Sequence, residues 1–327
     1  MYTYLGTTTL KSGEQMDLGV VHCPDPSWAA QVLPLLGHKG RETKDHIEAA
    51  LSGPLDGLDT RFYLGTIGGR AVTNVMIVGA RGVGILGHVY TVPEHRQKGA
   101  YGALMATQMA DIQRQGYRIL TLGTGFESHP YWIYHKFGFR SIDGTSGRMK
   151  WLADPEAEAR HFQAGATTVR PMRWDDWAAL NVLAFQRQEP NEELPRSWTF
   201  RLKGQGSLEG SFSTLRRNLA RKVPITPLVL ESESGAVVGW AVLQPDEMAF
   251  GDGWLIDLYV HPQFRDEADR LLEALPWPEH GRVAAYCSEP DGYRAAALRQ
   301  AGLTELTRLP GWLKRGEAPV DLCVFVR

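Results

Sequence analysis

The sequence is poor in cysteine and has neither a long apolar run nor an excess of charge of one sign. Its 3 cysteines, Cys23, Cys287 and Cys323, stand at no metal-binding or redox spacing, so we interpret them as packing residues in a reducing compartment. No apolar stretch approaches the length of a membrane-spanning helix, and the N-terminus lacks a basic segment followed by an apolar one. We therefore expect a cytoplasmic protein without a membrane partner.

Charged and metal-binding residues are not concentrated anywhere either. The 35 basic side chains nearly cancel the 37 acidic ones, and the formal net charge of −2 attracts neither nucleic acid nor anionic lipid. The 10 histidines are scattered, with no pair at the helical spacing of a catalytic zinc site. The sequence thus predicts no metal site and no nucleic-acid partner, and it favours a small ligand.

Length and periodicity predict two domains. The 327 residues, of which 43% are hydrophobic, suffice for two cores of ordinary size. Short β-rich runs separated by glycine turns predict an antiparallel meander in the first half. Strands are expected at 61–67, 71–78, 83–92 and 117–122, and helices at 26–36, 43–51, 99–115 and 131–136.

A polar, alanine-rich stretch at 153–167 divides the chain nearly in half. We place a linker there, between a domain at 1–152 and a domain at 168–327. The order of elements recurs beyond the linker, which indicates an internal repeat. The recurring elements are a strand at Val169, a helix from Asp175, a meander over 228–243, a strand over 254–260 and a helix over 267–275.

A basic turn at 96–99 joins the strand that ends before Pro93 to the next helix. The first amides of a helix lack intrahelical acceptors, and the macrodipole adds roughly half a positive charge, so such a terminus attracts anions. Gly99 lets the main chain approach an anion without a Cβ in the way. The turn therefore predicts a cradle for the pyrophosphate of a phosphorylated cofactor.

The second half has lost this cradle. Alignment of 258–262 with 89–93 sets Asp257 on His88, Arg265 on Arg96 and Ala268 on Gly99. Three carboxylates near that turn would repel a pyrophosphate, those of Asp266, Glu267 and Asp269. We therefore expect the chemistry to reside in 1–152.

The order of strand, proline, Arg96-x-x-Gly99, helix, strand and the run Tyr-His-Lys-Phe-Gly-Phe at 134–139 resembles the GNAT superfamily of acyl-CoA-dependent N-acyltransferases. The resemblance implies an α/β fold of the α+β type, with two tandem GNAT-like domains. Each domain would be a mixed, mostly antiparallel twisted sheet flanked by helices. It also implies acetyl-CoA as the cofactor.

In that family the strand before the turn pairs with the pantetheine arm of the cofactor, and the turn itself binds the pyrophosphate. The matching residues are Tyr90, Thr91 and Val92 for the pantetheine arm, and Arg96, Gln97, Lys98, Gly99, Ala100, Tyr101, Gly102 and Ala103 for the pyrophosphate.

The turn departs from the family pattern at one position. Many members have glycine or alanine where this chain has Tyr101, and the next glycine here is Gly102. An alternative register, Gln97-x-x-Ala100-x-Gly102, would take Leu104 out of the helical position that the buried leucine of the family occupies. We therefore keep Arg96 as the first residue of the motif.

Acyl transfer from a thioester to an amine needs a base for the amine and a proton for the departing thiolate. Tyr134 matches the tyrosine that lies near the thioester sulfur in many members. A phenol with a pKa of about 10 stays protonated at neutral pH and can donate to a thiolate. Tyr134 is therefore the predicted general acid, and the alternative is that it only packs with neighbouring aromatic side chains.

The predicted base is His88. Strand alternation would set Leu86, His88, Tyr90 and Val92 on one face, where some relatives carry a glutamate that reaches the amine through water. An imidazole with a pKa of about 6.5 suits a general base. A structural role for this histidine stays open, and Glu127 and His129 are rival bases in the loop before the second helix.

The sequence predicts an N-acetyltransferase that moves an acetyl group from acetyl-CoA directly to a primary amine of a small molecule or peptide. The second half would close the acceptor pocket or form a homodimer. The alternative is a non-catalytic acyl-CoA-binding sensor or scaffold. Tandem relatives acetylate aminoglycosides or a thiol-precursor amine, and the expected acceptor walls at 27–51 and 143–150 do not select among these acceptors.

Overall fold

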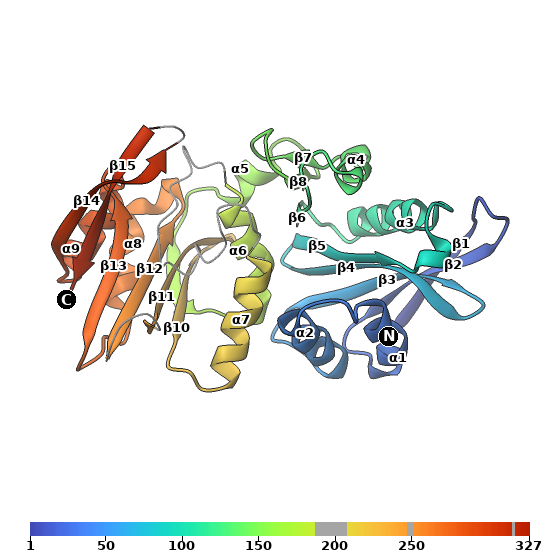
Figure 1. Cartoon of the computed structure of the whole chain (residues 1–327), viewed down its shortest axis with the longest axis horizontal. Coiled ribbons are helices and arrows are strands. Elements are labelled where there is room, and N and C mark those ends of the chain that lie inside the picture. The colour runs from blue at the N-terminus through green and yellow to red at the C-terminus, as the bar shows by residue number, and fades with distance from the viewer. Residues whose placement is uncertain (187–207, 247–251, 316–317) are drawn as a thin grey trace. The chain divides into compact units, whose positions relative to one another are not determined.

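The structure is a computed structural model of the chain, and it describes residues 1–186, 208–246, 252–315 and 318–327. The chain divides into two compact units (Figure 1). The first unit comprises Met1–Glu158 and Arg173–Phe185, and the second unit comprises Ala159–Met172 and Gln186–Arg327. One contains an 8-stranded sheet and the other a 7-stranded sheet, both mixed and mostly antiparallel and both flanked by helices. The predicted fold class is confirmed.

The first unit follows the predicted meander and adds a hairpin at the N-terminus. Its sheet has the order β1-β2-β3-β4-β5-β6-β8-β7, in which only β5 and β6 run parallel among the recorded pairs. The strands are β1 (Tyr2–Thr9), β2 (Gln15–His22), β3 (Asp59–Ile67), β4 (Arg70–Ala80), β5 (Val83–Thr91), β6 (Ile119–Gly123), β7 (Arg140–Ser141) and β8 (Arg148–Leu152). The helices are α1 (Ala29–Leu35), α2 (Arg41–Ser52), α3 (Ala100–Arg114), α4 (His129–Lys136) and α6 (Trp177–Ala184), and α5 (Ala157–His161) spans the chain boundary between the first and second units.

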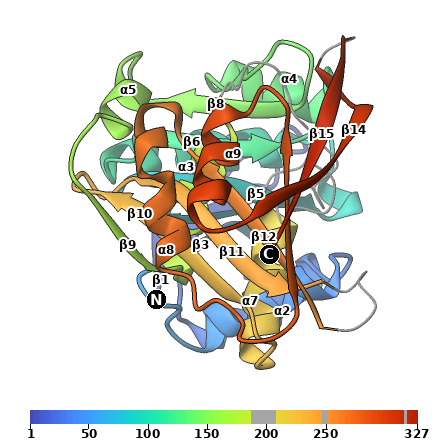
Figure 2. The same cartoon turned by 90° about the vertical axis from the view of Figure 1, so that its left-hand side faces the viewer.

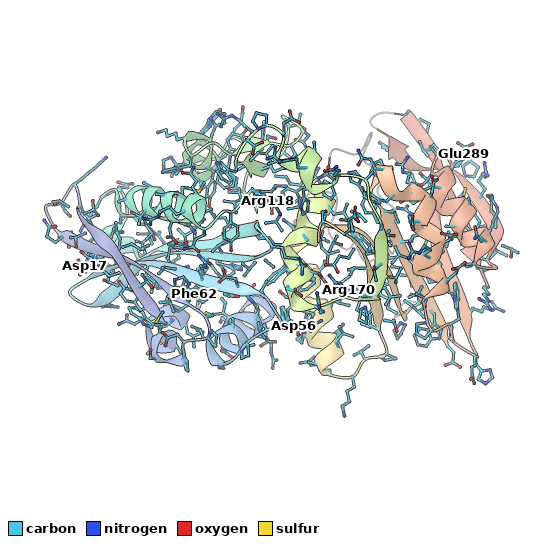
Figure 3. The ribbon with its side chains drawn as sticks, turned by 180° about the vertical axis from the view of Figure 1, so that it is seen from behind. Asp17, Asp56, Phe62, Arg118, Arg170 and Glu289 are labelled. Atoms are coloured by element: carbon cyan, nitrogen blue, oxygen red, sulfur yellow. The ribbon has the colours of Figure 1, made fainter. Side chains whose placement is uncertain are left out.

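Helices cover both faces of this sheet. Figure 1 shows α3 on one face and α1 and α2 on the other. The buried stripe of α3, which includes Leu104, Met105 and Ile112, packs against strand residues such as Ile77 and Leu86. The opposite face buries Phe62, which is labelled in Figure 3. The core of the first unit therefore lies on both sides of β3, β4 and β5.

The segment 173–185, which the sequence places in the second half, belongs to the first unit. Its helix α6 contacts β4, β5 and β6, and Asn181 Nδ2 donates to Thr121 Oγ1 at 2.7 Å. Arg81 pairs with the carboxylates of Asp175 at 2.6 Å and Asp176 at 2.9 Å. The Trp174 N–H also donates to Asp56, labelled in Figure 3. A stretch from beyond the predicted linker therefore completes one face of the first sheet.

The second unit repeats the topology of the first. Its strand order is β14-β15-β13-β12-β11-β10-β9, and β12 and β13 form its one recorded parallel pair. As in the first unit, the last two strands lie in the reverse of their sequence order, so β15 pairs with β13. Figure 2 shows α8 and α9 side by side. The predicted repeat is thus present in the strand order. The elements are β9 (Thr167–Pro171), β10 (Thr226–Ser232), β11 (Val237–Pro245), β12 (Gly253–Val260), β13 (Arg282–Ser288), β14 (Thr304–Arg315), β15 (Ala318–Val326), α7 (Glu209–Ala220), α8 (Ala268–Glu273) and α9 (Gly292–Gln300).

The three cysteines are free thiols. Cys287 and Cys323 are far apart in the sequence but are register partners across β13 and β15. Burial raises the pKa of Cys287 to about 12 and also raises the pKa of Cys323, so both stay protonated at neutral pH. In the described part of the chain, no helix is both long and apolar enough to cross a membrane.

Candidate active site

The site begins where β5 and β6 separate. The two strands pair only at Val83–Ile119, Gly84–Leu120 and Ile85–Thr121, and β5 then runs on to Thr91 while β6 ends at Gly123. The Val92 N–H donates to the Val72 carbonyl at 2.9 Å, so alternation turns the main-chain groups of Thr91 away from β4. The far half of β5 therefore offers a strand edge on the side of β6, as the resemblance implies for a pantetheine arm.

A β-bulge interrupts β5 beside this edge. The register of β4 and β5 passes from Met76–Gly87 to Asn74–Tyr90, so both His88 and Val89 lie opposite Val75. His88 takes a φ of +50°, which a non-glycine residue seldom adopts. The Asn74 Nδ2 donates to the His88 carbonyl at 2.8 Å and supports this conformation.

The bulge makes the predicted strand alternation wrong for Tyr90. Leu86, Val89 and Val92 pack with the core beneath α3, whereas the Tyr90 ring lies 4.8 Å from the ring of His38 on the other face. An inserted residue shifts the period of 2 by one position, so Tyr90 no longer shares a face with Leu86. His88 lies in the bulge, where the alternation of side chains between the two faces reverses, and it remains the predicted base.

The turn at 96–99 has the geometry of an anion cradle. Gly99 has a φ of +89° and is the N-cap of α3, and Ala103 N–H donates to the Gly99 carbonyl at 3.1 Å. The amides of Ala100, Tyr101 and Gly102 precede that bond, so the helix offers them no acceptor. A Cβ on Gly102 would meet nothing within 4 Å, and one on Gly99 would meet only Lys11 at 3.9 Å. The space above these amides is therefore open to a ligand.

The two basic side chains of the turn are already engaged. Lys98 Nζ donates to Glu14 Oε2 at 2.9 Å, and hydrogen bonds from Ser12 and Lys98 lower the pKa of Glu14. Arg96 Nε donates to the Thr91 carbonyl at 3.0 Å, and the guanidinium lies over the Tyr90 ring. Glu14 comes from the β1–β2 hairpin, which the sequence analysis did not predict. The main-chain amides thus form the larger part of the cradle.

Tyr134 lies on α4, whose ends follow local rules. Ser128 caps its N-terminus by accepting from the Tyr131 N–H, and Gly138 follows its C-terminus with a φ of +92°. The Tyr134 side chain is buried and packs edge-on to Phe139 and Tyr101. Burial raises the pKa of Tyr101, and the neighbouring Tyr134 is a further cause. Glu127 and His129, the rival bases, are exposed.

His46 of α2 is a buried histidine near His88 that the sequence analysis missed. It packs edge-on against Trp177 at 4.8 Å, and neither ring nitrogen has a hydrogen-bond partner among the described residues. Burial lowers the pKa of His46 to about 3, and the charge of His88 adds to this effect. His46 is therefore a neutral imidazole at physiological pH. Its only signal in the sequence is its place on the apolar side of a helix.

We expect His46 to make the stability of the protein depend on pH. Its pKa is about 3 when folded and about 6.5 when unfolded, so the unfolded chain binds the extra proton between these values. The free energy of unfolding should fall as pH falls below 6.5, by up to about 1.4 kcal/mol per pH unit. The variant His46→Phe keeps a ring against Trp177 and should flatten this dependence in urea titrations at pH 5 to 7.

The control for that experiment is His129→Phe, because His129 is exposed. This variant should keep the slope of the unmodified protein. An identical slope in His46→Phe and in the unmodified protein would contradict the assignment of the effect to His46.

In the second unit, the strand edge that corresponds to the edge at Thr91 is occupied. The His261 N–H donates to the Val238 carbonyl at 2.7 Å, the counterpart of the bond between Val92 and Val72, and β12 pairs with β11 without a bulge. The Val260 N–H, which corresponds to that of Thr91, donates to Tyr293 Oη at 3.3 Å. Arg265 lies over the same tyrosine ring, 4.9 Å from its centroid. Its own side chains therefore occupy the strand edge that is open in the first unit.

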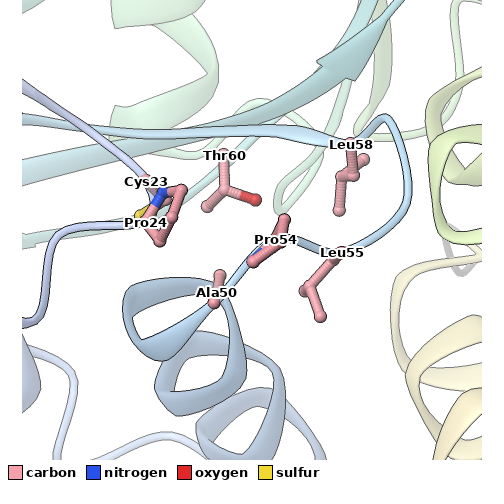
Figure 4. A pocket seen from close by; sticks show the side chains of 8 residues that line it. Cys23, Pro24, Ala50, Pro54, Leu55, Leu58 and Thr60 are labelled. Carbon is pink, nitrogen blue, oxygen red and sulfur yellow. The ribbon is translucent and has the colours of Figure 1, made fainter.

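A pocket of about 60 Å³ lies elsewhere in the first unit, between the end of β2, the end of α2 and the start of β3 (Figure 4). It is lined by Cys23, Pro24, Ala50, Gly53, Pro54, Leu55, Leu58 and Thr60. Burial raises the pKa of Cys23 to about 12, so this thiol is not a nucleophile at neutral pH. The pocket has room for about two water molecules and is too small for a nucleotide.

Comparisons with known proteins find acetyltransferase structures that are similar to about half of the chain. The N-acetyltransferase of Staphylococcus aureus Mu50 is 13% identical over 50% of this chain and 98% of its own, with a TM-score of 0.41. The ribosomal-protein-alanine N-acetyltransferase of Brucella melitensis is 19% identical over 49% of this chain and 98% of its own, with a TM-score of 0.39.

A GNAT superfamily phosphinothricin acetyltransferase of Sinorhizobium meliloti, in complex with acetyl-CoA, is 14% identical over 49% of this chain and 87% of its own, with a TM-score of 0.38. No protein-family model and no curated protein matches the chain.

Proposed function

We propose that the chain is an acetyl-CoA-dependent N-acetyltransferase whose first unit holds the acyl donor. The observation that carries the proposal is the succession of a strand edge at Thr91 that pairs with no further strand in the described part of the chain, the bulge at His88 and an open helix N-terminus at Gly99. The edge suits the amide-rich pantetheine arm, which can bond to it as an added strand, and the helix N-terminus suits the diphosphate. The residues present thus fit coenzyme A.

When bound, acetyl-CoA supplies an activated acetyl thioester. The amides of Ala100, Tyr101 and Gly102 hold the diphosphate. The Arg96 guanidinium, which contacts the Thr91 carbonyl and the Tyr90 ring in the structure, adds positive charge beside the cradle. Thr91 positions the arm along β5. Each of these contacts binds or orients the donor, and none transfers a proton.

Two residues carry the proton transfers in this proposal. His88, at the bulge, takes a proton from the acceptor amine, because only the neutral amine is a nucleophile. Tyr134 gives the proton of its hydroxyl to the departing thiolate. The bulge supports this assignment, because a strained backbone that β4 holds in place is typical of a functional site.

The second candidate function is a non-catalytic acyl-CoA-binding module. The observation in its favour is the burial of Tyr134, whose ring packs edge-on against Phe139 and Tyr101, as that of a structural tyrosine would. Both candidates bind coenzyme A, so binding alone does not separate them.

The experiment that separates them measures thiol release from acetyl-CoA with a panel of primary amines, including aminoglycosides and amino-terminal peptides. The enzyme should release thiol in proportion to at least one amine, with the acetylated product seen by mass spectrometry. A protein that binds coenzyme A and acetylates no member of the panel would favour the binding module.

A further inference from the structure

The bulge in β5 is supported by a side chain of the neighbouring strand. Asn74, in the interior of β4, donates from Nδ2 to the His88 carbonyl at 2.8 Å. A bulge takes its extra residue out of the regular ladder, so the main-chain groups of that residue need other partners. The Asn74 amide therefore supplies to His88 a bond that an uninterrupted strand would receive from the main chain of its neighbour.

This contact sets the orientation of the Asn74 amide. The side chain is 0% exposed, and if the amide were turned over, its Oδ1 would face the His88 carbonyl oxygen and the two acceptors would repel each other. In the observed orientation Oδ1 is buried without a hydrogen-bond partner among the described residues. A buried acceptor without a partner destabilises a fold. The packing of β4 alone therefore does not account for an asparagine at this position.

The conformation that Asn74 supports decides where the His88 imidazole lies. His88 has a φ of +50°, in the left-handed region, whereas the residues of a regular strand are extended. A residue with a Cβ enters the left-handed region only at a cost in free energy, and the side chain leaves the strand in another direction there. Without the bond from Asn74, the bulge would relax to other conformations and the imidazole would move with it.

We propose that Asn74 is a positioning residue for the base His88, because its amide fixes the bulge from which the imidazole reaches the acceptor amine. The inference rests on the proposed function of this site. In that reaction the imidazole takes the proton that the amine loses as the N–C bond forms and the C–S bond breaks. The sulfur receives the proton of Tyr134, and exchange with solvent restores both residues. No bond of Asn74 itself is made or broken.

The test compares Asn74→Leu, His88→Gln and the double variant in the full chain, by steady-state thiol release from acetyl-CoA. Leucine has nearly the shape of asparagine but lacks the donor. We expect Asn74→Leu to lower kcat by about 10- to 100-fold, because a small displacement of the imidazole suffices for such a loss. In the His88→Gln background the same substitution should have no further effect on kcat.

The affinity for the donor should be spared in Asn74→Leu. Beyond the bulge, Thr73 Oγ1 still bonds to the Tyr90 carbonyl at 3.2 Å and to Thr91 Oγ1 at 2.8 Å, so the strand edge keeps its place. The KM for acetyl-CoA should therefore change less than about twofold.

The matched control is Asn181→Leu. Asn181 is also 0% exposed, and its Nδ2 donates to Thr121 Oγ1 of another strand at 2.7 Å. This variant loses a buried amide bond of the same kind, so it should lower the melting temperature at least as much as Asn74→Leu and leave kcat within about twofold. A second variant, Asn74→Ala, should show the same loss of kcat as Asn74→Leu.

The inference would be overturned by unchanged turnover in the two Asn74 variants, by their failure to fold, or by an equal loss of kcat in Asn181→Leu. An equal loss with and without the His88 imidazole, or full activity of His88→Gln, would also overturn it, because Asn74 acts through that side chain. An unmodified chain that binds coenzyme A but releases no thiol with any amine would instead overturn the proposed function, and the inference with it.

Discussion

Replacement of Gly99 by aspartate is expected to weaken the binding of coenzyme A by at least about 100-fold. The residue has a φ of +89°, and the space where its Cβ would stand is open. A carboxylate there would fill the cradle and repel the diphosphate across a few ångströms. Isothermal titration calorimetry measures the affinity directly.

The matched control is Gly116→Asp. Gly116 follows the same helix with a φ of +76°, and its Cβ position has nothing within 4 Å. Both variants therefore carry the same kind of backbone strain, but only one places a charge in the cradle. Retained affinity in Gly99→Asp, or an equal loss in Gly116→Asp, would contradict the cradle.

Replacement of Tyr134 by phenylalanine is expected to lower kcat by about 10²- to 10⁴-fold, the usual contribution of a general acid. The ring stays in contact with Phe139, so folding and the affinity for coenzyme A should not change. The measurement is the steady-state rate of thiol release, with thermal unfolding and calorimetry on the same samples.

A structural tyrosine would behave in another way. Loss of its hydroxyl would lower the melting temperature and leave kcat within a few-fold of the original value. That result, together with an intact affinity for coenzyme A, would favour the binding module over the enzyme.

The sequence predicts most elements of the first sheet because apolar side chains recur there with a strong period. The strands around Phe62 and Ile77 and the stripe of Leu104, Met105 and Ile112 on α3 lie where the pattern places them. The roles of Gly99 and Gly138 were also predictable, because the start of α3 and the end of α4 each require a positive φ. The β1–β2 hairpin could not be predicted, because no residue of β1 is buried and the strand carries no apolar alternation.

Three features of the site depend on tertiary structure that local patterns do not contain. The bulge at His88 inserts a residue into a strand of ordinary composition, so the face of Tyr90 could not be read from alternation. Glu14 reaches Lys98 from a distant hairpin. The helix α6, which follows the predicted linker in the sequence, packs on β4 and β5 and covers a sheet face that would otherwise be exposed.

The predicted domains 1–152 and 168–327, with a linker at 153–167, remain a prediction. The compact units of the structure follow contacts instead, and they assign 173–185 to the first unit. The alignment of Val260 with Thr91 agrees with the main-chain bonds of the next residues, Val92 and His261. The agreement does not extend to Asp257 and His88, because the bulge at His88 has no counterpart in β12.

The central claim is that one unit binds an acyl-CoA and the other does not. The most direct measurement is the number of coenzyme A molecules bound per chain, by calorimetry on the full-length protein. One site per chain is expected, because Gly99 is open whereas Tyr293 occupies the corresponding edge in the second unit. Two sites, or none, would contradict the account.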